Sequence, residues 1–135
     1  MKEITLEATL ENITRVTAWI DEALEALDCP LKAQMQIDIA IDELFGNIAH
    51  YAYSGKTGMV TVRFDHDAVA NAVSITFIDQ GVPFDPLLQD DPDTTLGADE
   101  RKIGGLGIFL VRKTMDSVSY ARREDRNILN IRKTI

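Results

Sequence analysis

Glu43, Asn47 and His50 are spaced so that one face of a helix would carry a carboxylate, a carboxamide and an imidazole. At about 100° per residue, positions i, i+4 and i+7 lie on one stripe. The carboxylate can act as a general base, and the carboxamide oxygen can ligate a hard cation. An ordinary polar helix edge is the alternative, and this group alone does not decide between the two.

A second candidate group follows an apolar run. Asp79 comes directly after residues 73–78, and Gly81 lies two positions later. A carboxylate at the end of a buried strand can accept a hydrogen bond from an exocyclic amine, and a glycine leaves room for a flat ring. A simple Asp-x-Gly turn is the alternative, because aspartate and glycine are common turn residues.

A glycine cluster forms the third group. Gly104, Gly105 and Gly107, with Leu106 between them, stand at the start of a predicted helix over residues 105–115. Glycines let backbone N–H groups come close to a bound anion, and the positive end of the helix dipole favours negative charge there. A tight junction between loop and helix is the alternative. Neither G-x-x-x-x-G-K-[ST] nor G-x-G-x-x-G after a strand is present, which excludes a P-loop and a Rossmann site.

Residues 80–103 separate the last two groups and show no steady hydrophobic period. This segment of 24 residues holds three of the four prolines and six acidic residues. Segments longer than about 15 residues without secondary structure are uncommon inside compact domains and often form lids. We therefore expect a lid over a binding site, with a disordered insertion as the alternative.

The hydrophobic pattern predicts the elements that must position these groups. Side chains alternate where we expect strands, and apolar positions recur at threes and fours where we expect helices. The predicted strands span residues 3–8, 60–64, 73–78, 118–121 and 128–131, and the predicted helices span residues 10–28, 31–53 and 105–115. The last hairpin is expected to turn at residues 124–127. This order predicts a single α+β domain over residues 1–135, a two-layer sandwich with helices on one face of a mainly antiparallel mixed sheet.

The composition narrows the class of protein. With 135 residues, 45% of them hydrophobic and 27% charged, the chain has the composition of a globular domain. A net charge of −8 without a Lys/Arg-rich run argues against direct nucleic-acid binding. No apolar run approaches the ~20 residues of a membrane helix, and the N-terminus has no signal-peptide pattern. Cys29 is the only cysteine, which excludes disulfides and thiolate zinc sites. We expect a cytoplasmic protein without a membrane association.

The three groups occur in an order that resembles the Bergerat-fold (GHKL) ATP-binding family, which includes histidine kinases and gyrase-type ATPases. Residues 43–47 (ELFGN) resemble its N box, Asp79-x-Gly81 resembles its G1 box, and residues 104–107 (GGLG) resemble its G2 box. The run D-x-G-x-P-F-D-P from Asp79 and the stretch over residues 105–113 are most similar to one branch, the bacterial anti-sigma factor serine/threonine-protein kinases.

The resemblance implies a histidine-kinase-like ATPase domain that uses ATP and Mg²⁺. Asp79 would accept the adenine amino group, with Gly81 against the ring. Asn47 would ligate Mg²⁺, and Glu43 would act as the general base. Gly105 and Gly107, with the start of the third predicted helix, would hold the phosphates. The other cofactor-binding residues expected here are His50, Gly104 and Leu106.

The chain departs from the family pattern at two points. Gly46 stands before Asn47, where the family more often has a bulkier residue, and a glycine inside a helix costs about 1 kcal/mol. We therefore expect something to approach the helix closely at Gly46. The motifs themselves hold no obvious basic residue to neutralise phosphates, although Arg101, Lys102 and Arg112 lie nearby in the sequence.

The resemblance also implies partners. A member of this branch holds a sigma factor inactive and phosphorylates Ser or Thr on an anti-anti-sigma protein of the STAS type, and a homodimer is compatible with it. A nucleotide-dependent protein-binding switch with little or no kinase activity is the alternative. The presence of Glu43 favours chemistry, because a pure binder needs no base on that stripe. The sequence identifies neither the sigma factor, nor the protein substrate, nor the oligomeric state.

Overall fold

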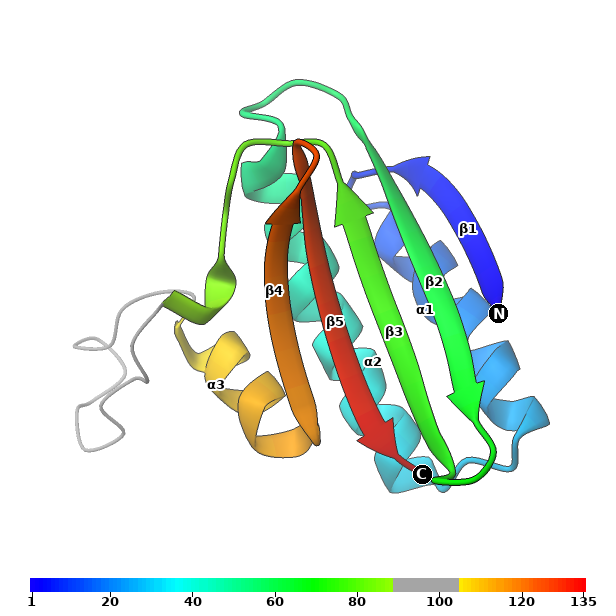
Figure 1. Cartoon of the computed structure of the whole chain (residues 1–135). Helices are drawn as coiled ribbons and strands as arrows, with labels where there is room; N and C mark the ends of the chain where they lie inside the picture. Colours follow the sequence, from blue (N-terminus) through cyan, green and yellow to red (C-terminus); the bar gives the residue numbers. More distant parts are fainter. Residues whose placement is uncertain (89–104) are drawn as a thin grey trace.

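Five strands form one sheet in the computed structural model, which describes residues 1–88 and 105–135, apart from the side chains of 105 and 106. The strands are β1 (Lys2–Glu7), β2 (Met59–Asp67), β3 (Ala72–Asp79), β4 (Ser117–Arg123) and β5 (Arg126–Thr134). Their order in the sheet is β1-β2-β3-β5-β4, and all four ladders between these strands are antiparallel (Figure 1).

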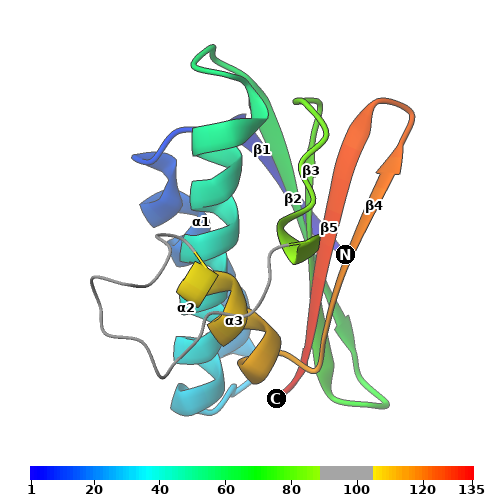
Figure 2. The same cartoon turned by 90° about the vertical axis from the view of Figure 1, so that its left-hand side faces the viewer.

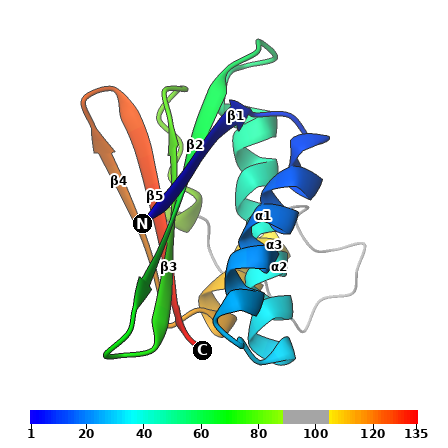
Figure 3. The ribbon, with the colours of Figure 1, turned by 90° about the vertical axis from the view of Figure 1, so that its right-hand side faces the viewer.

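Three helices cover one face of the sheet and leave the other face open, as Figures 2 and 3 show. They are α1 (Asn12–Ala26), α2 (Leu31–Asn47) and α3 (Gly105–Thr114). Two short turns accompany them, a π-helical turn over Ile48–Ala52 and a 3₁₀ turn over Pro86–Leu88. The predicted α+β sandwich with helices on one face of the sheet is therefore confirmed.

The core forms because the strand and helix periods point their apolar residues at one another. Alternate residues of β2, among them Val60 and Val62, are fully buried against the helices, whereas their neighbours lie on the open face. On α2, Ile37, Ile41 and Leu44 are fully buried in the same core. No helix among the described residues is long and apolar enough to cross a bilayer.

The helix boundaries differ from the prediction in ways that the local backbone explains. The first helix ends at Ala26 because Asp28 adopts a left-handed conformation (φ 55°) and the amides of Asp28 and Cys29 bond back to the last turn. The second helix was predicted to run from 31 to 53, but its α-helical part ends at Asn47. A π-turn follows, and its wider spacing rotates the residues after Asn47 away from the α-helical stripe.

An acidic pair lies between α1 and α2. Asp21 and Asp38 each have one buried side-chain oxygen, Oδ1, without a hydrogen-bond donor among the described residues. The pKa of Asp38 is raised to about 7, chiefly by burial, and the carboxyl group of Asp21 and the charge of Glu25 contribute to this rise in the same direction. Asp38 therefore holds a proton to a much higher pH than an exposed aspartate would.

Candidate functional site

A small pocket lies between the two layers, where α2 ends and β3 ends. Its walls come from α2, the π-turn, β3, the segment after β3, β4 and β5, and its lining residues are Leu44, Asn47, Ile48, Ala52, Asp79, Phe84, Pro86, Tyr120, Asn127 and Leu129. Most of the lining is apolar, with Asp79, Asn47 and Asn127 as polar exceptions. The enclosed volume is about 20 Å³, which is room for about one water molecule.

Asp79 is the buried charged residue of this pocket. The alternation of β3 turns it toward the helices, and it is 4% exposed. Its Oδ1 accepts hydrogen bonds from the Gly81 backbone N–H (2.9 Å) and from Asn127 Nδ2 (2.9 Å). Both hydrogen bonds are accepted by Oδ1, and the other carboxylate oxygen, Oδ2, accepts none from a described residue. A ligand donor, such as an exocyclic amino group, would find its acceptor there.

Asn127 is a site residue that the sequence reasoning missed. It is 4% exposed and stands opposite Asp79 in the ladder between β3 and β5. Its Nδ2 also donates to the Val82 carbonyl (2.8 Å), while its Oδ1 accepts from the Phe84 N–H (3.4 Å) and from the Tyr120 hydroxyl. Every donor and acceptor of this buried amide is therefore satisfied.

The position of the last turn explains why Asn127 was missed. We expected the last hairpin to turn at residues 124–127, but only Glu124 and Asp125 adopt the left-handed turn conformation and β5 begins at Arg126. Asn127 is thus a strand residue with an inward side chain. A polar residue two positions before the buried Leu129 was the available signal.

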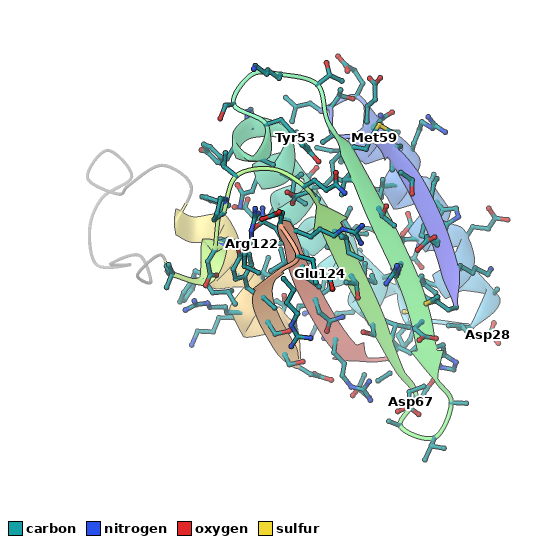
Figure 4. The ribbon with its side chains drawn as sticks, turned by 45° about the horizontal axis from the view of Figure 1, so that its top comes forward. Asp28, Tyr53, Met59, Asp67, Arg122 and Glu124 are labelled. Atoms are coloured by element: carbon teal, nitrogen blue, oxygen red, sulfur yellow. The ribbon has the colours of Figure 1, made fainter. Side chains whose placement is uncertain are left out.

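Tyr53 is a second residue that the sequence reasoning missed. Its hydroxyl donates to the Met59 carbonyl and accepts from the Gln80 N–H (3.0 Å), which joins the end of the π-turn to β2 and to the end of β3 (Figure 4). Its ring lies against Gly58, where a Cβ atom would come within 2.2 Å of the ring. Tyr53 therefore holds the strand end next to Asp79 in place.

Position 81 must be glycine for a steric reason that the sequence alone did not reveal. A Cβ atom at Gly81 would lie 2.1 Å from the carbonyl oxygen of Ala52, and the next amide, Val82 N–H, donates to that oxygen (2.7 Å). The Gly81 carbonyl accepts from Arg122 Nη1 (2.7 Å), and Arg122 lies at this end of the sheet in Figure 4. The contact between Gly81 and an adenine ring stays a prediction.

Glu43 and Asn47 meet as their spacing predicted. Asn47 Nδ2 donates to Glu43 Oε1 at 3.4 Å, which leaves Asn47 Oδ1 without a described donor. Burial raises the pKa of Glu43; the bond from Asn47 opposes this rise and the charge of Asp42 adds to it. The carboxylate lies against the first turn of α3, because a Cβ atom at Gly107 would be 2.1 Å from Glu43 Cδ.

The remaining residues that the sequence predicted for the site do not line the pocket in the described part of the chain. His50 is exposed in the π-turn and does not line the pocket. Gly105 and Leu106 open α3, while Gly104, Arg101 and Lys102 lie outside the described residues. The Arg112 guanidinium donates to the Leu87 carbonyl. The phosphate-holding role of the glycines therefore stays a prediction, and so does a ligand contact of His50.

Residues 81–88, here called the closing segment, narrow the pocket. Phe84 and Pro86 line it, and the Phe84 ring stacks on Tyr51 with ring centroids 5.1 Å apart. Since an adenine ring is far larger than one water molecule, a base could occupy this pocket only if the closing segment moved outward. Asn127 binds this segment and Asp79 at once, so it connects the floor of the pocket to the closing segment.

Comparison with known proteins identifies the family to which this chain belongs. A relative in Bordetella bronchiseptica, the serine/threonine-protein kinase BtrW, is 23% identical over 129 residues, which are 95% of this chain and 89% of that protein. Two solved structures of the blue-light activated histidine kinase of Erythrobacter litoralis share the fold.

This chain matches the first structure with a TM-score of 0.56 and 20% sequence identity, and the second with a TM-score of 0.58 and 16% identity. The matches cover 78% and 93% of this chain, but only 31% of the first histidine kinase chain and 60% of the second. A sequence profile described as "Histidine kinase-like ATPase domain" matches residues 6–133. Because this match covers nearly the whole chain, the protein belongs to the histidine kinase-like ATPase domain family.

Proposed function

We propose that this protein is an anti-sigma regulatory factor that transfers the γ-phosphoryl group of Mg-ATP to Ser or Thr of an anti-anti-sigma partner of the STAS type. The observation that carries the proposal is the position of Glu43. Its carboxylate is held beside Asn47 and against Gly107, at the edge of a pocket that contains the buried Asp79. An acid, an amide oxygen and a buried acceptor are thus grouped at one place.

The pocket suits the adenine base chemically. The unbonded Oδ2 of Asp79 matches an amino group, and apolar side chains such as Leu44 and Leu129 match the faces of an aromatic ring. Asn47 Oδ1 is the oxygen that would hold Mg²⁺. Bound there, the cation would neutralise charge on the phosphates.

Glu43 is suited to receive the proton of an incoming hydroxyl group. Its pKa is raised, and a base acts best when its pKa lies nearer the working pH. Phosphoryl transfer often has a loose transition state, so part of the role of Glu43 is to orient the hydroxyl group. The name of the relative BtrW, a serine/threonine-protein kinase, supports a hydroxyl acceptor.

Incubation with γ-labelled ATP, Mg²⁺ and each STAS-domain protein encoded in the same genome tests the proposal. We expect label on a serine or threonine of one of these proteins, and labelling about 10²–10⁴-fold slower with Glu43→Gln. If no STAS-domain protein is labelled, the kinase assignment is wrong. ATP affinity measured in parallel then shows whether the chain is instead a binding switch.

One observation favours that second function. Asn127 bonds both to Asp79 and to the closing segment. A base bound at Asp79 would therefore alter the hydrogen bonds that hold Val82 and Phe84. A partner that contacts the closing segment would then distinguish nucleotide-bound from free protein without any transfer. Partner binding that depends on ATP, with no labelled product, would identify this function.

A further inference from the structure

The outward side of α2 carries an apolar ridge. Leu31, Met35 and Ile39 are 71%, 55% and 51% exposed. Residues four apart lie above one another on a helix, so these three form a line along α2. Asp42, three residues after Ile39, and Gly46, four residues after Asp42, lie on the same side of the helix at about 100° per residue. We call these five residues the α2 ridge.

This ridge is unusual for a surface helix. The opposite side of α2 already supplies the core, where Ile37, Ile41 and Leu44 are fully buried. The side that faces water is normally polar, and an apolar surface rimmed by charge marks a site of interaction. Packing against the sheet therefore does not account for Leu31, Met35 and Ile39.

Gly46 shows that the ridge leads to the candidate site. The sequence predicted a close approach there, but no described atom lies within 4 Å of a Cβ atom built at Gly46. The described part of the chain therefore does not fill this space. Gly46 directly precedes Asn47 and lies one turn after Glu43, so a molecule packed on the ridge would reach these two side chains.

The charges along the ridge indicate the chemistry of the molecule that covers it. On the side of α1, Asp21 and Glu25 lie close enough to Asp38 for their negative charges to act on it. Asp42 on the ridge raises the pKa of its neighbour Glu43 through its negative charge. Lys32, next to Leu31 in the chain, adds one positive charge. An apolar surface with a mostly acidic border fits a partner with an apolar centre and a basic border.

We propose that the α2 ridge docks the protein that accepts the phosphoryl group, through an apolar face of that protein bordered by lysine and arginine. This inference rests on the proposed kinase function and adds the surface that places the acceptor hydroxyl at Glu43. A second copy of this chain fits less well, because it would bring two acidic borders together and each chain carries a net charge of −8.

The test uses full-length chain and the STAS-domain protein that the wild type labels. Met35→Glu and Ile39→Glu should each raise the KM for that protein at least tenfold, with kcat at saturating partner and the ATP affinity within twofold of wild type. Val69→Glu is the matched control, because Val69 is 100% exposed in the turn between β2 and β3, and it should leave KM unchanged.

Two further variants separate docking from folding. Gly46→Leu should raise KM at least tenfold without lowering the melting temperature, because leucine favours a helix more than glycine does. Glu25→Lys should raise KM about threefold at low salt, and the difference should vanish at high salt, as expected for a border charge.

Several results would overturn this inference. A KM within twofold of wild type for both Met35→Glu and Ile39→Glu would show that the acceptor binds elsewhere. If sedimentation shows a dimer of the chain alone that Met35→Glu dissociates, the ridge is covered by a second copy. If the wild type labels no STAS-domain protein, the proposed function itself fails and the docking inference falls with it.

Discussion

Replacement of Asn127 by alanine tests whether Asp79 depends on a residue that the ligand need not touch. The substitution removes the Nδ2 donor that reaches Asp79 Oδ1 at 2.9 Å and the Val82 carbonyl at 2.8 Å. Asp79 is only 4% exposed, so bulk water cannot readily replace the lost donor. The Tyr120 hydroxyl group and the Phe84 amide lose their acceptor as well.

The expected loss of stability follows from these bonds. A hydrogen bond to a charged group contributes about 1.5–3 kcal/mol and one between neutral groups about 0.5–1.5 kcal/mol. We therefore expect Asn127→Ala to lower the free energy of unfolding by about 2–4 kcal/mol. In the folded fraction, Asp79 is no longer held in orientation, and the affinity for ATP should fall about tenfold, which corresponds to ~1.4 kcal/mol.

Asn130→Ala is the matched control on the same strand. Asn130 stands on the open face of the sheet, where its Nδ2 donates to Ser74 Oγ (2.8 Å) and Thr76 Oγ1 (2.9 Å). Its loss should cost about 1 kcal/mol and leave ATP affinity unchanged. Urea unfolding and calorimetric titration with ATP measure both quantities. The reasoning is refuted if the two variants lose equal stability and both bind ATP as the wild type does.

Four further predictions concern single side chains. Asp79→Asn should weaken ATP binding by about 10- to 100-fold in calorimetry, because one charge-assisted hydrogen bond is lost; unchanged affinity of the folded variant would contradict the adenine assignment. Glu43→Gln should change ATP affinity by less than about threefold but lower labelling of a STAS-domain protein by about 10²–10⁴; labelling at the wild-type rate would show that Glu43 is not the base. Gly46→Ala should raise the free energy of unfolding by about 1 kcal/mol, because space is open there and alanine favours the helix; a loss in urea unfolding would show an unseen contact. Asp38 has a folded pKa of about 7 against the usual 3.8, so the folded state binds more protons and wild-type stability should fall as pH rises from about 4 to 7. In Asp38→Asn, most of this decrease in stability with pH should be absent, and melting curves at pH 5 and pH 8 will measure the difference.

The sequence was informative wherever the evidence was local. Alternating residues such as Val60 and Val62 predicted the strands, and the order of strands and helices predicted a sandwich with helices on one face. The contact between Glu43 and Asn47 followed from helical spacing alone. Each of these inferences depends on residues that are near one another in the chain.

The features that could not be predicted from the sequence depend on contacts between residues that are far apart in the chain. The bond from Asn127 to Asp79 spans 48 positions, and the bond from the Gln80 N–H to the Tyr53 hydroxyl spans 27. No periodicity reports such pairs, because the ladder between β3 and β5 places Asn127 opposite Asp79 and the packing of the π-turn sets where Tyr53 lies. The π-turn after Asn47 was missed for a related reason, since its residues have the same hydrophobic pattern as a continuing α-helix.

The closing segment is coupled to Asp79 through Asn127. Val82 and Phe84 are held by Asn127, and Asn127 also donates to the carboxylate that is expected to bind adenine. The enclosed volume of about 20 Å³ is too small for a base, so a base bound at Asp79 would have to break or move some of these bonds. The free energy of binding there would then include the cost of opening this segment. Arg122→Ala removes the bond to the Gly81 carbonyl, so it should lower this cost and raise the affinity for ATP in calorimetric titration, whereas an unchanged or lower affinity would contradict the argument.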